Sequence, residues 1–71
     1  MDRSTLLNHL AQAERHAAEG NRHLARQEQL IAQLDQDGHD TTEALKVLST
    51  LRSTQALHEA DIVRILGQLA E

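Results

Sequence analysis

The sequence predicts an all-α fold: an antiparallel helical hairpin, with helices over about residues 4–36 and 41–69, that forms a homodimeric four-helix bundle. Three observations predict it. Ala, Leu, Gln, Glu and Arg dominate the 71 residues, and these side chains lose little freedom in a helix. Two long runs carry apolar residues on a seven-residue period, and one turn signal separates them. The chain is therefore expected to be a single domain over residues 1–71.

The first helix is expected from about Ser4 to about Gln36. Along one stripe, spacings of four and three alternate without a slip, which is the a/d pattern of a coiled coil. We call this stripe the first seam; it consists of Leu6, Leu10, Ala13, Ala17, Gly20, Leu24, Gln27, Ile31 and Leu34. Beside the seam, His9, His16 and His23 recur at seven-residue intervals, and an Ala follows each of them after two residues.

The turn is predicted at Asp37-Gly38-His39-Asp40. Gly38 is suited to the left-handed conformation that follows many helices, because it lacks a Cβ. Asp40 is expected to be the N-cap of the next helix, with Glu43 reaching back as in a capping box. Only Gly38 and His39 then remain as a connection, so the two helices must be antiparallel neighbours.

The second helix, from about Thr41 to about Leu69, has a matching stripe, the second seam. It consists of Ala44, Leu48, Leu51, Gln55, His58, Ile62, Ile65 and Leu69. If residues equidistant from the turn face each other, Ala13, Ala17 and Gly20 oppose Ile65, Ile62 and His58. A mid-helix Gly costs about 1 kcal/mol relative to Ala. We therefore expect Gly20 to be there to admit the His58 ring.

Further aliphatic residues make the apolar face wider than a two-stranded coiled coil uses. A lone hairpin would leave them partly in water, and an apolar patch on so small a protein usually marks an interface. The chain has no Cys to supply a disulfide, and domains below roughly 70–80 residues usually need a disulfide, a metal or a partner. A second copy is therefore expected to cover these residues, which are Leu7, Leu30, Leu45, Val47, Val63 and Leu66.

Three seam residues are polar, namely Gln27, Gln55 and His58. Buried amides must be hydrogen-bonded, so we interpret the two Gln residues as devices that fix the register or the oligomeric state. His58 is expected to pair with a Gln or a backbone group. For the two Gln residues, the alternative is that they line a polar pocket for a ligand.

The five His residues raise the possibility of a metal site. His16 with Glu19, and Glu19 with His23, have spacings at which two side chains of a helix can share an ion. Two ligands make only half a site, so a second copy or the second helix would have to supply the others. The purely structural interpretation is that these His residues flank the seam as amphipathic side chains and bind no metal. The segment from His58 to Ile62 begins like the zinc motif H-E-x-x-H, but Ile62 stands in place of its second His.

Composition excludes several other functions. Cys and aromatic residues are absent, which removes thiol chemistry and base stacking. The net charge is −4 and the cations are scattered, so nucleic-acid binding is not expected. We find no leader, no apolar run long enough for a membrane, no phosphate-binding loop and no nucleophile motif. The sequence thus predicts a cytoplasmic protein without cofactor that is not an enzyme. Its expected role is protein–protein interaction or regulation through a self-associating module; the alternative is a His-based bundle that binds or senses a transition metal.

Several segments resemble a group of short bacterial proteins of unassigned function. They are the run His9-Leu-Ala-Gln-Ala-Glu-Arg-His16, the turn Gly38-His-Asp-Thr41 and the segment Leu57-His-Glu-Ala-Asp61. The resemblance extends over nearly the whole chain and is most specific at the turn. It implies a stand-alone helical hairpin in the cytoplasm and assigns no catalytic residue.

Overall fold

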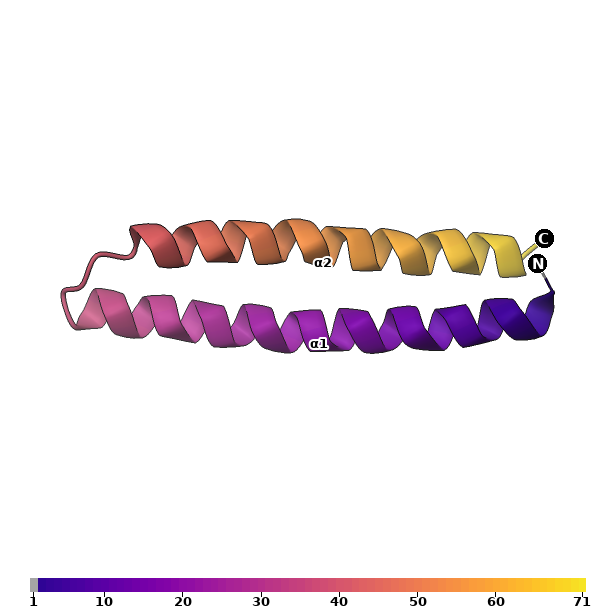
Figure 1. The fold of residues 1–71 in the computed structure, drawn as a ribbon, viewed down its shortest axis with the longest axis horizontal. Helices are drawn as coiled ribbons and strands as arrows, with labels where there is room; N and C mark the ends of the chain where they lie inside the picture. The colour runs from indigo at the N-terminus through magenta and orange to yellow at the C-terminus, as the bar shows by residue number, and fades with distance from the viewer. Residues whose placement is uncertain (1) are drawn as a thin grey trace.

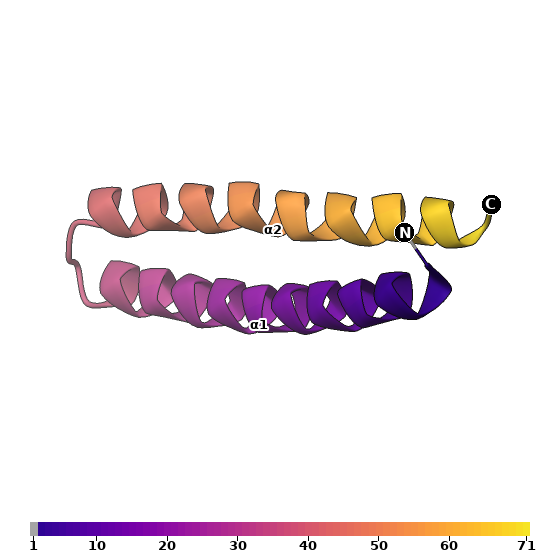
Figure 2. The same ribbon diagram turned by 45° about the vertical axis from the view of Figure 1, so that its right-hand side comes forward.

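The computed structural model describes residues 2–71, and these form two antiparallel helices joined by one turn (Figure 1). Helix α1 extends over Arg3–Gln36 and helix α2 over Thr42–Leu69. The molecule is a rod of 53 × 14 × 13 Å, and Asp2 and Glu71 lie near the same end of it (Figure 2). The prediction of an all-helical hairpin is confirmed, with both helices within one residue of their expected bounds.

Helix α1 begins with a side-chain cap that the sequence analysis missed. Asp2 has an extended backbone conformation, and its Oδ1 accepts a hydrogen bond of 2.7 Å from the backbone N–H of Thr5. This bond satisfies one of the four amides that a helix N-terminus leaves without an intrahelical partner. The helix therefore starts at Arg3 rather than at Ser4.

The turn begins with a Schellman motif centred on Gly38, which has φ 77° as predicted. His39 N–H donates to the Leu34 carbonyl at 2.8 Å, and Gly38 N–H donates to the Asp35 carbonyl at 3.1 Å. Two of the carbonyls at the end of α1 are satisfied in this way. The remaining turn residues run back beside α1 before α2 begins, so α1 extends past the start of α2 (Figure 1).

The start of α2 differs from the expected capping box. The N-cap is Thr41, whose carbonyl accepts from Leu45 N–H at 2.9 Å, and Asp40 precedes it. Asp40 still uses its carboxylate as foreseen: Oδ1 accepts from Thr42 N–H at 3.0 Å and from Thr42 Oγ1 at 2.7 Å. Glu43 does not reach back, because it pairs with Lys46 one turn further along the helix, at 3.3 Å.

These caps predict a loss of stability in acid. Hydrogen bonds from Thr5 and from Thr42 hold the pKa values of Asp2 and Asp40, respectively, below the ordinary 3.8. A carboxyl group with a lowered folded-state pKa stabilises the fold above its unfolded-state pKa, and this contribution is lost as the pH falls through the folded-state pKa. We therefore expect the Tm of the hairpin to fall as the pH is lowered below about 4.

The variant Asp40→Asn keeps a capping oxygen but removes the titration. Its Tm, followed by circular dichroism from pH 5 to pH 2.5, should decline less than that of the unmodified chain. Asp35→Asn removes the same charge from a residue whose side chain caps nothing, and should decline like the unmodified chain. Equal declines for all three proteins would contradict a role for the Asp40 cap.

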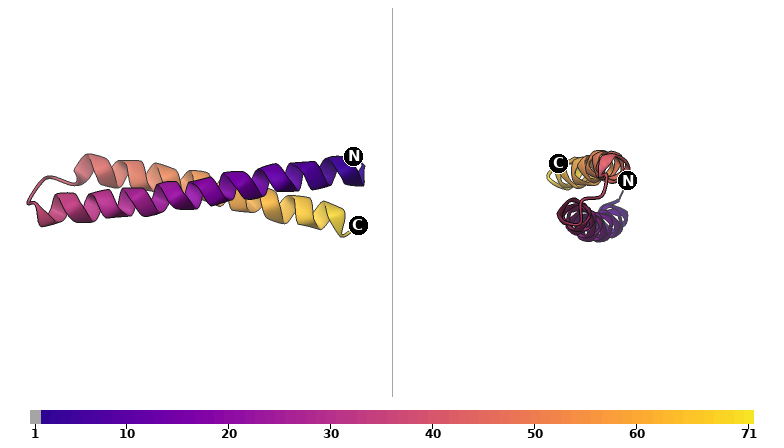
Figure 3. Two further views of the ribbon diagram at one scale, coloured as in Figure 1. Left: turned by 90° about the horizontal axis from the view of Figure 1, so that it is seen from below. Right: turned by 90° about the vertical axis from the view of Figure 1, so that its left-hand side faces the viewer.

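The core follows the two predicted seams, since every seam residue is buried or half-buried. The two helices cross at a shallow angle near the middle of the rod (Figure 3), and the best-packed part of the core lies in the half toward the chain ends. There Leu6, Ala13 and Ile65 form one cluster, and Leu10, Ile62 and Leu69 pack against it. Among the described residues of the half near the turn, Leu48 is the one buried aliphatic residue. Neither helix has an apolar stretch sufficient to cross a bilayer.

The hairpin has two different sides. Glu28 and Arg52 each directly follow a seam residue, and they form an ion pair of 3.9 Å between the helices. Other residues that directly follow a seam residue therefore lie on the same side of the hairpin as this ion pair. We call this the alanine side; it carries Leu7, Leu45, Val63 and Leu66, with Ala11, Ala18, Ala25 and Ala32.

The opposite side, which we call the histidine side, is built from residues that directly precede a seam residue. It carries His9, His16 and His23 from α1, and Val47, Thr54 and Asp61 from α2. Leu30 lies there as well, and so does Leu57, three residues after Thr54. All six aliphatic residues of the predicted interface are exposed. They are divided between the sides, with Leu30 and Val47 on the histidine side, so one flat contact would not cover them all.

Candidate functional site

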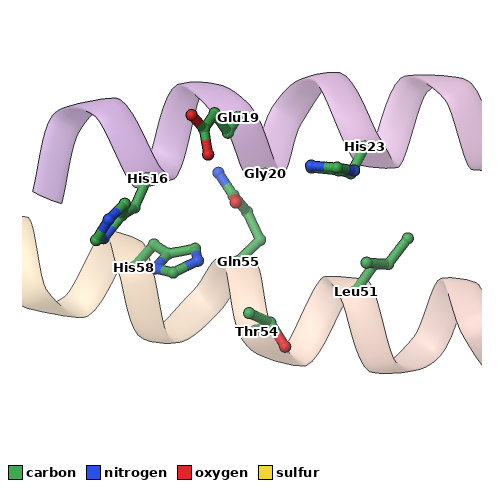
Figure 4. A pocket seen from close by; sticks show the side chains of 8 residues that line it. All are labelled: His16, Glu19, Gly20, His23, Leu51, Thr54, Gln55 and His58. Atoms are coloured by element: carbon green, nitrogen blue, oxygen red, sulfur yellow. The ribbon is translucent and has the colours of Figure 1, made fainter.

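A groove of about 270 Å³ lies on the histidine side, halfway along the hairpin (Figure 4). Each helix contributes four residues to its lining: His16, Glu19, Gly20 and His23 from α1, and Leu51, Thr54, Gln55 and His58 from α2. A second groove of about 260 Å³ continues toward the chain ends, and its lining includes His9, Asp61 and Arg64. His16 lines both grooves.

Gln55 forms the floor of the first groove and is only 4% exposed. Its Nε2 donates to the Ala17 carbonyl at 2.8 Å and to Asn21 Oδ1 at 3.1 Å. The prediction that this buried amide is hydrogen-bonded is confirmed, although the sequence did not point to Asn21. Its other polar atom, Oε1, is buried without a hydrogen-bond partner among residues 2–71.

Gly20 faces the Gln55 amide and not the His58 ring, so that prediction is wrong. A Cβ added at Gly20 would overlap Oε1 and would lie 2.8 Å from Cδ of Gln55. Oε1 therefore occupies the space that any other residue's Cβ would fill, where it faces a Cα hydrogen of Gly20. Such Cα–H···O contacts are weak but favourable, and this one gives the buried oxygen its nearest compensation.

The wrong pairing has a physical cause at the turn. Because α1 extends past the start of α2, the true layers are one seam step away from those of a symmetric turn. With Gly20 opposite Gln55, the seam period places Ala17 opposite His58 and Ala13 opposite Ile62. Small residues still oppose large ones, as expected, but with different partners.

Gln27 supplies a second polar tie between the helices. Its Nε2 donates to the Ala44 carbonyl at 2.9 Å, so this amide extends from α1 to the backbone of α2. Gln55 extends in the opposite direction, from α2 to the backbone of α1. Sliding one helix by a seam step would break both bonds. Both hydrogen bonds therefore favour the observed register of the hairpin.

The imidazoles of His16 and His58 meet across the two helices. Their ring centres are 5.7 Å apart and the ring planes are tilted by 48°. His58 is half-buried in the second seam, as expected, but its neighbour is this ring rather than a Gln or a backbone group. The arrangement gives the groove two nitrogen donors from different helices.

The metal set expected from the sequence is only partly brought together. His16, Glu19 and His23 all line the first groove, which places them on one side of α1. Within residues 2–71, however, no three His, Asp or Glu side chains are grouped closely enough to hold an ion. The pair His16–His58 joins residues 42 positions apart. The sequence could have pointed to it only through the correct register of the two seams.

Comparison of the chain with protein-family models, with curated proteins and with solved structures finds no match. The resemblance to short bacterial hairpin proteins therefore stays a prediction.

Proposed function

We propose that this protein is a non-catalytic helical module whose role is protein–protein interaction or regulation, and that two copies associate through their alanine sides into a four-helix bundle. The solvent-accessible surface supports this most directly. The hairpin exposes 5281 Å². A compact monomer of 7.9 kDa is expected to expose only about 4,400 Å². The excess is close to the ~800 Å² that each partner buries in a standard interface.

The alanine side is the better of the two sides for a second copy. Its four aliphatic residues include Val63, which is 69% exposed, and Leu66. The alanines of α1 repeat every seven residues beside them and would let a second helix approach closely. The histidine side carries the imidazoles of His9, His16 and His23, which favour contact with water. Each side has one ion pair, Asp61–Arg64 on the histidine side and Glu28–Arg52 on the alanine side. Association through the alanine side would leave the groove open.

The test is the molar mass in solution, measured by light scattering over a range of protein concentrations. We expect twice the 7.9 kDa mass of one chain. Val63→Lys should shift the mass toward that of one chain, because it places a charge in the proposed contact. A well-folded protein that keeps the mass of a single chain at high concentration would contradict the proposal.

Leu57→Lys is the matched control. Leu57 is 70% exposed, almost the same as Val63, but it lies on the histidine side. This variant should keep the doubled mass. If Leu57→Lys separated the copies and Val63→Lys did not, the second copy would sit on the histidine side and the assignment of the interface would be wrong.

A further inference from the structure

We propose that His16 and His58 bind a divalent transition-metal ion between the two helices. Glu19 does not form a three-residue group with them in this structure, and it would turn toward the ion when the ion binds. The proposed site lies in the first groove, on the side of the hairpin away from the proposed contact between copies. It therefore stands independently of the self-association.

The distance between the two rings fits a shared ion. An imidazole nitrogen binds Zn²⁺ at about 2.0–2.1 Å, and the ring centre lies about 1.1 Å behind that nitrogen. Two rings at a tetrahedral angle then have centres about 5 Å apart, and a moderately wider angle gives about 5.6 Å. The observed separation of His16 and His58 is 5.7 Å. Binding would require side-chain rotations that direct one nitrogen of each ring at a common point.

Glu19 is the ligand best placed to join them. It lies three residues after His16, on the same side of α1, and it lines the groove with both rings (Figure 4). Within residues 2–71 the Glu19 carboxylate forms no ion pair with Arg15, with Arg22 or with any other cation. Glu19 would have to change its side-chain rotamer to reach the ion, and water from the open groove would complete the coordination.

This site differs from the one expected along a single helix. His16 and His23 are separated by about 10.5 Å of helix rise, which is too far for a shared ion. His58 takes the place of His23 because the register brings it against His16. Nitrogen ligands of this kind suit Zn²⁺, Ni²⁺ and Cu²⁺. With only two fixed ligands, we expect affinities to follow the general order in which Cu²⁺ exceeds Ni²⁺ and Zn²⁺.

An ion at this position would join α1 to α2 beside the Gln55 layer. It would bind the folded hairpin and not the unfolded chain, because the two His residues meet only when the helices pair. Binding should therefore raise the Tm by mass action. Since imidazoles must be unprotonated to act as ligands, the effect should disappear in acid.

The experiment is titration of the full chain with ZnCl₂ or NiCl₂, with calorimetry for affinity and circular dichroism for the Tm. We expect one ion per chain and a rise in Tm. Both His16→Ala and His58→Ala should weaken binding by about tenfold or more, and Glu19→Gln by less. The controls His9→Ala and His23→Ala should bind within about twofold of the unmodified chain.

Imidazole resonances in NMR spectra provide a second measurement, in which Zn²⁺ should shift those of His16 and His58 but not those of His39 in the turn. His58→Gln serves if His58→Ala fails to fold, since Gln occupies other seam positions of this chain. The absence of binding at excess metal would overturn the proposal. Binding that His23→Ala abolishes and His58→Ala preserves would also overturn it, in favour of ligands along α1.

Discussion

Replacing Gly20 with Ala is expected to destabilise the protein, although the same change in most helices stabilises it. The new Cβ would overlap Oε1 and Cδ of the buried Gln55 amide. Gln55 would have to move and lose its hydrogen bonds to Ala17 and Asn21. Losing these bonds and leaving the amide buried outweighs the gain of about 0.5–1 kcal/mol in helix propensity. We expect a net loss of about 2 kcal/mol, or roughly 8–16 °C in Tm. Gly20→Leu should loosen the packing of the two helices further.

Gly67→Ala is the matched control, because Gly67 also lies inside a helix but a Cβ there meets no atom within 4 Å. It should raise the Tm. The opposite signs at the two glycines, measured by thermal or urea denaturation, are the diagnostic result. A Gly20→Ala variant as stable as Gly67→Ala would show that the Gln55 amide does not need the space above Gly20.

A double-mutant cycle isolates the contact. If Gly20→Ala acts through Gln55, the cost of the substitution should largely vanish in a Gln55→Ala background, because the side chain that clashes is gone. The coupling free energy between the two positions should then be about 1–3 kcal/mol. Additive effects would locate the strain elsewhere in α1.

Replacing Ile65 with Ala is the second substitution for which we expect a large effect. Ile65 is 3% exposed, the lowest value in the core, and it anchors the cluster with Leu6 and Ala13. Truncating a buried Ile to Ala costs 2–5 kcal/mol through lost transfer free energy and the cavity left behind. Because so few residues of this rod are buried, we expect a loss of about 2–4 kcal/mol and a largely unfolded chain at 37 °C.

Leu57→Ala removes an aliphatic side chain of similar size from an exposed position. Its effect should stay within about 0.5 kcal/mol. Both variants should be compared at one protein concentration, since the stability of a self-associating chain depends on it. A small effect at Ile65 would mean that the half of the rod near the chain ends is not the main source of stability.

The fold was predictable because its signals are local and repeated. The seams follow from a period of seven, and Gly38 marks the turn through its backbone conformation alone. The capping residues were less certain because Asp40, Thr41 and Thr42 all favour such positions. Asp2 was missed although Asp is among the residues preferred at an N-cap.

The site was harder to predict because it depends on the offset between the helices. The partners of Gly20 and His58 are set by how far α1 extends past α2, which is a property of the turn geometry that residue counting from Gly38 does not capture. Counting from Gly38 predicted His58 opposite Gly20, whereas the structure has Gln55 there, one seam step away. The same error concealed the contact between His16 and His58. The types of polar residue in the seams were informative, but their partners required the three-dimensional register.

The return of the chain to its starting end determines how the rod would act when joined to something else. Helix α1 alone would carry its two ends about 50 Å apart. Folding back cancels that separation, so Asp2 and Glu71 emerge near one pole of the 53 Å rod. Cargo fused to either terminus would gather at that pole, and the opposite tip would stay unobstructed. A hairpin of this kind would extend away from whatever is attached to its termini, and would not hold two attachments apart by its own length.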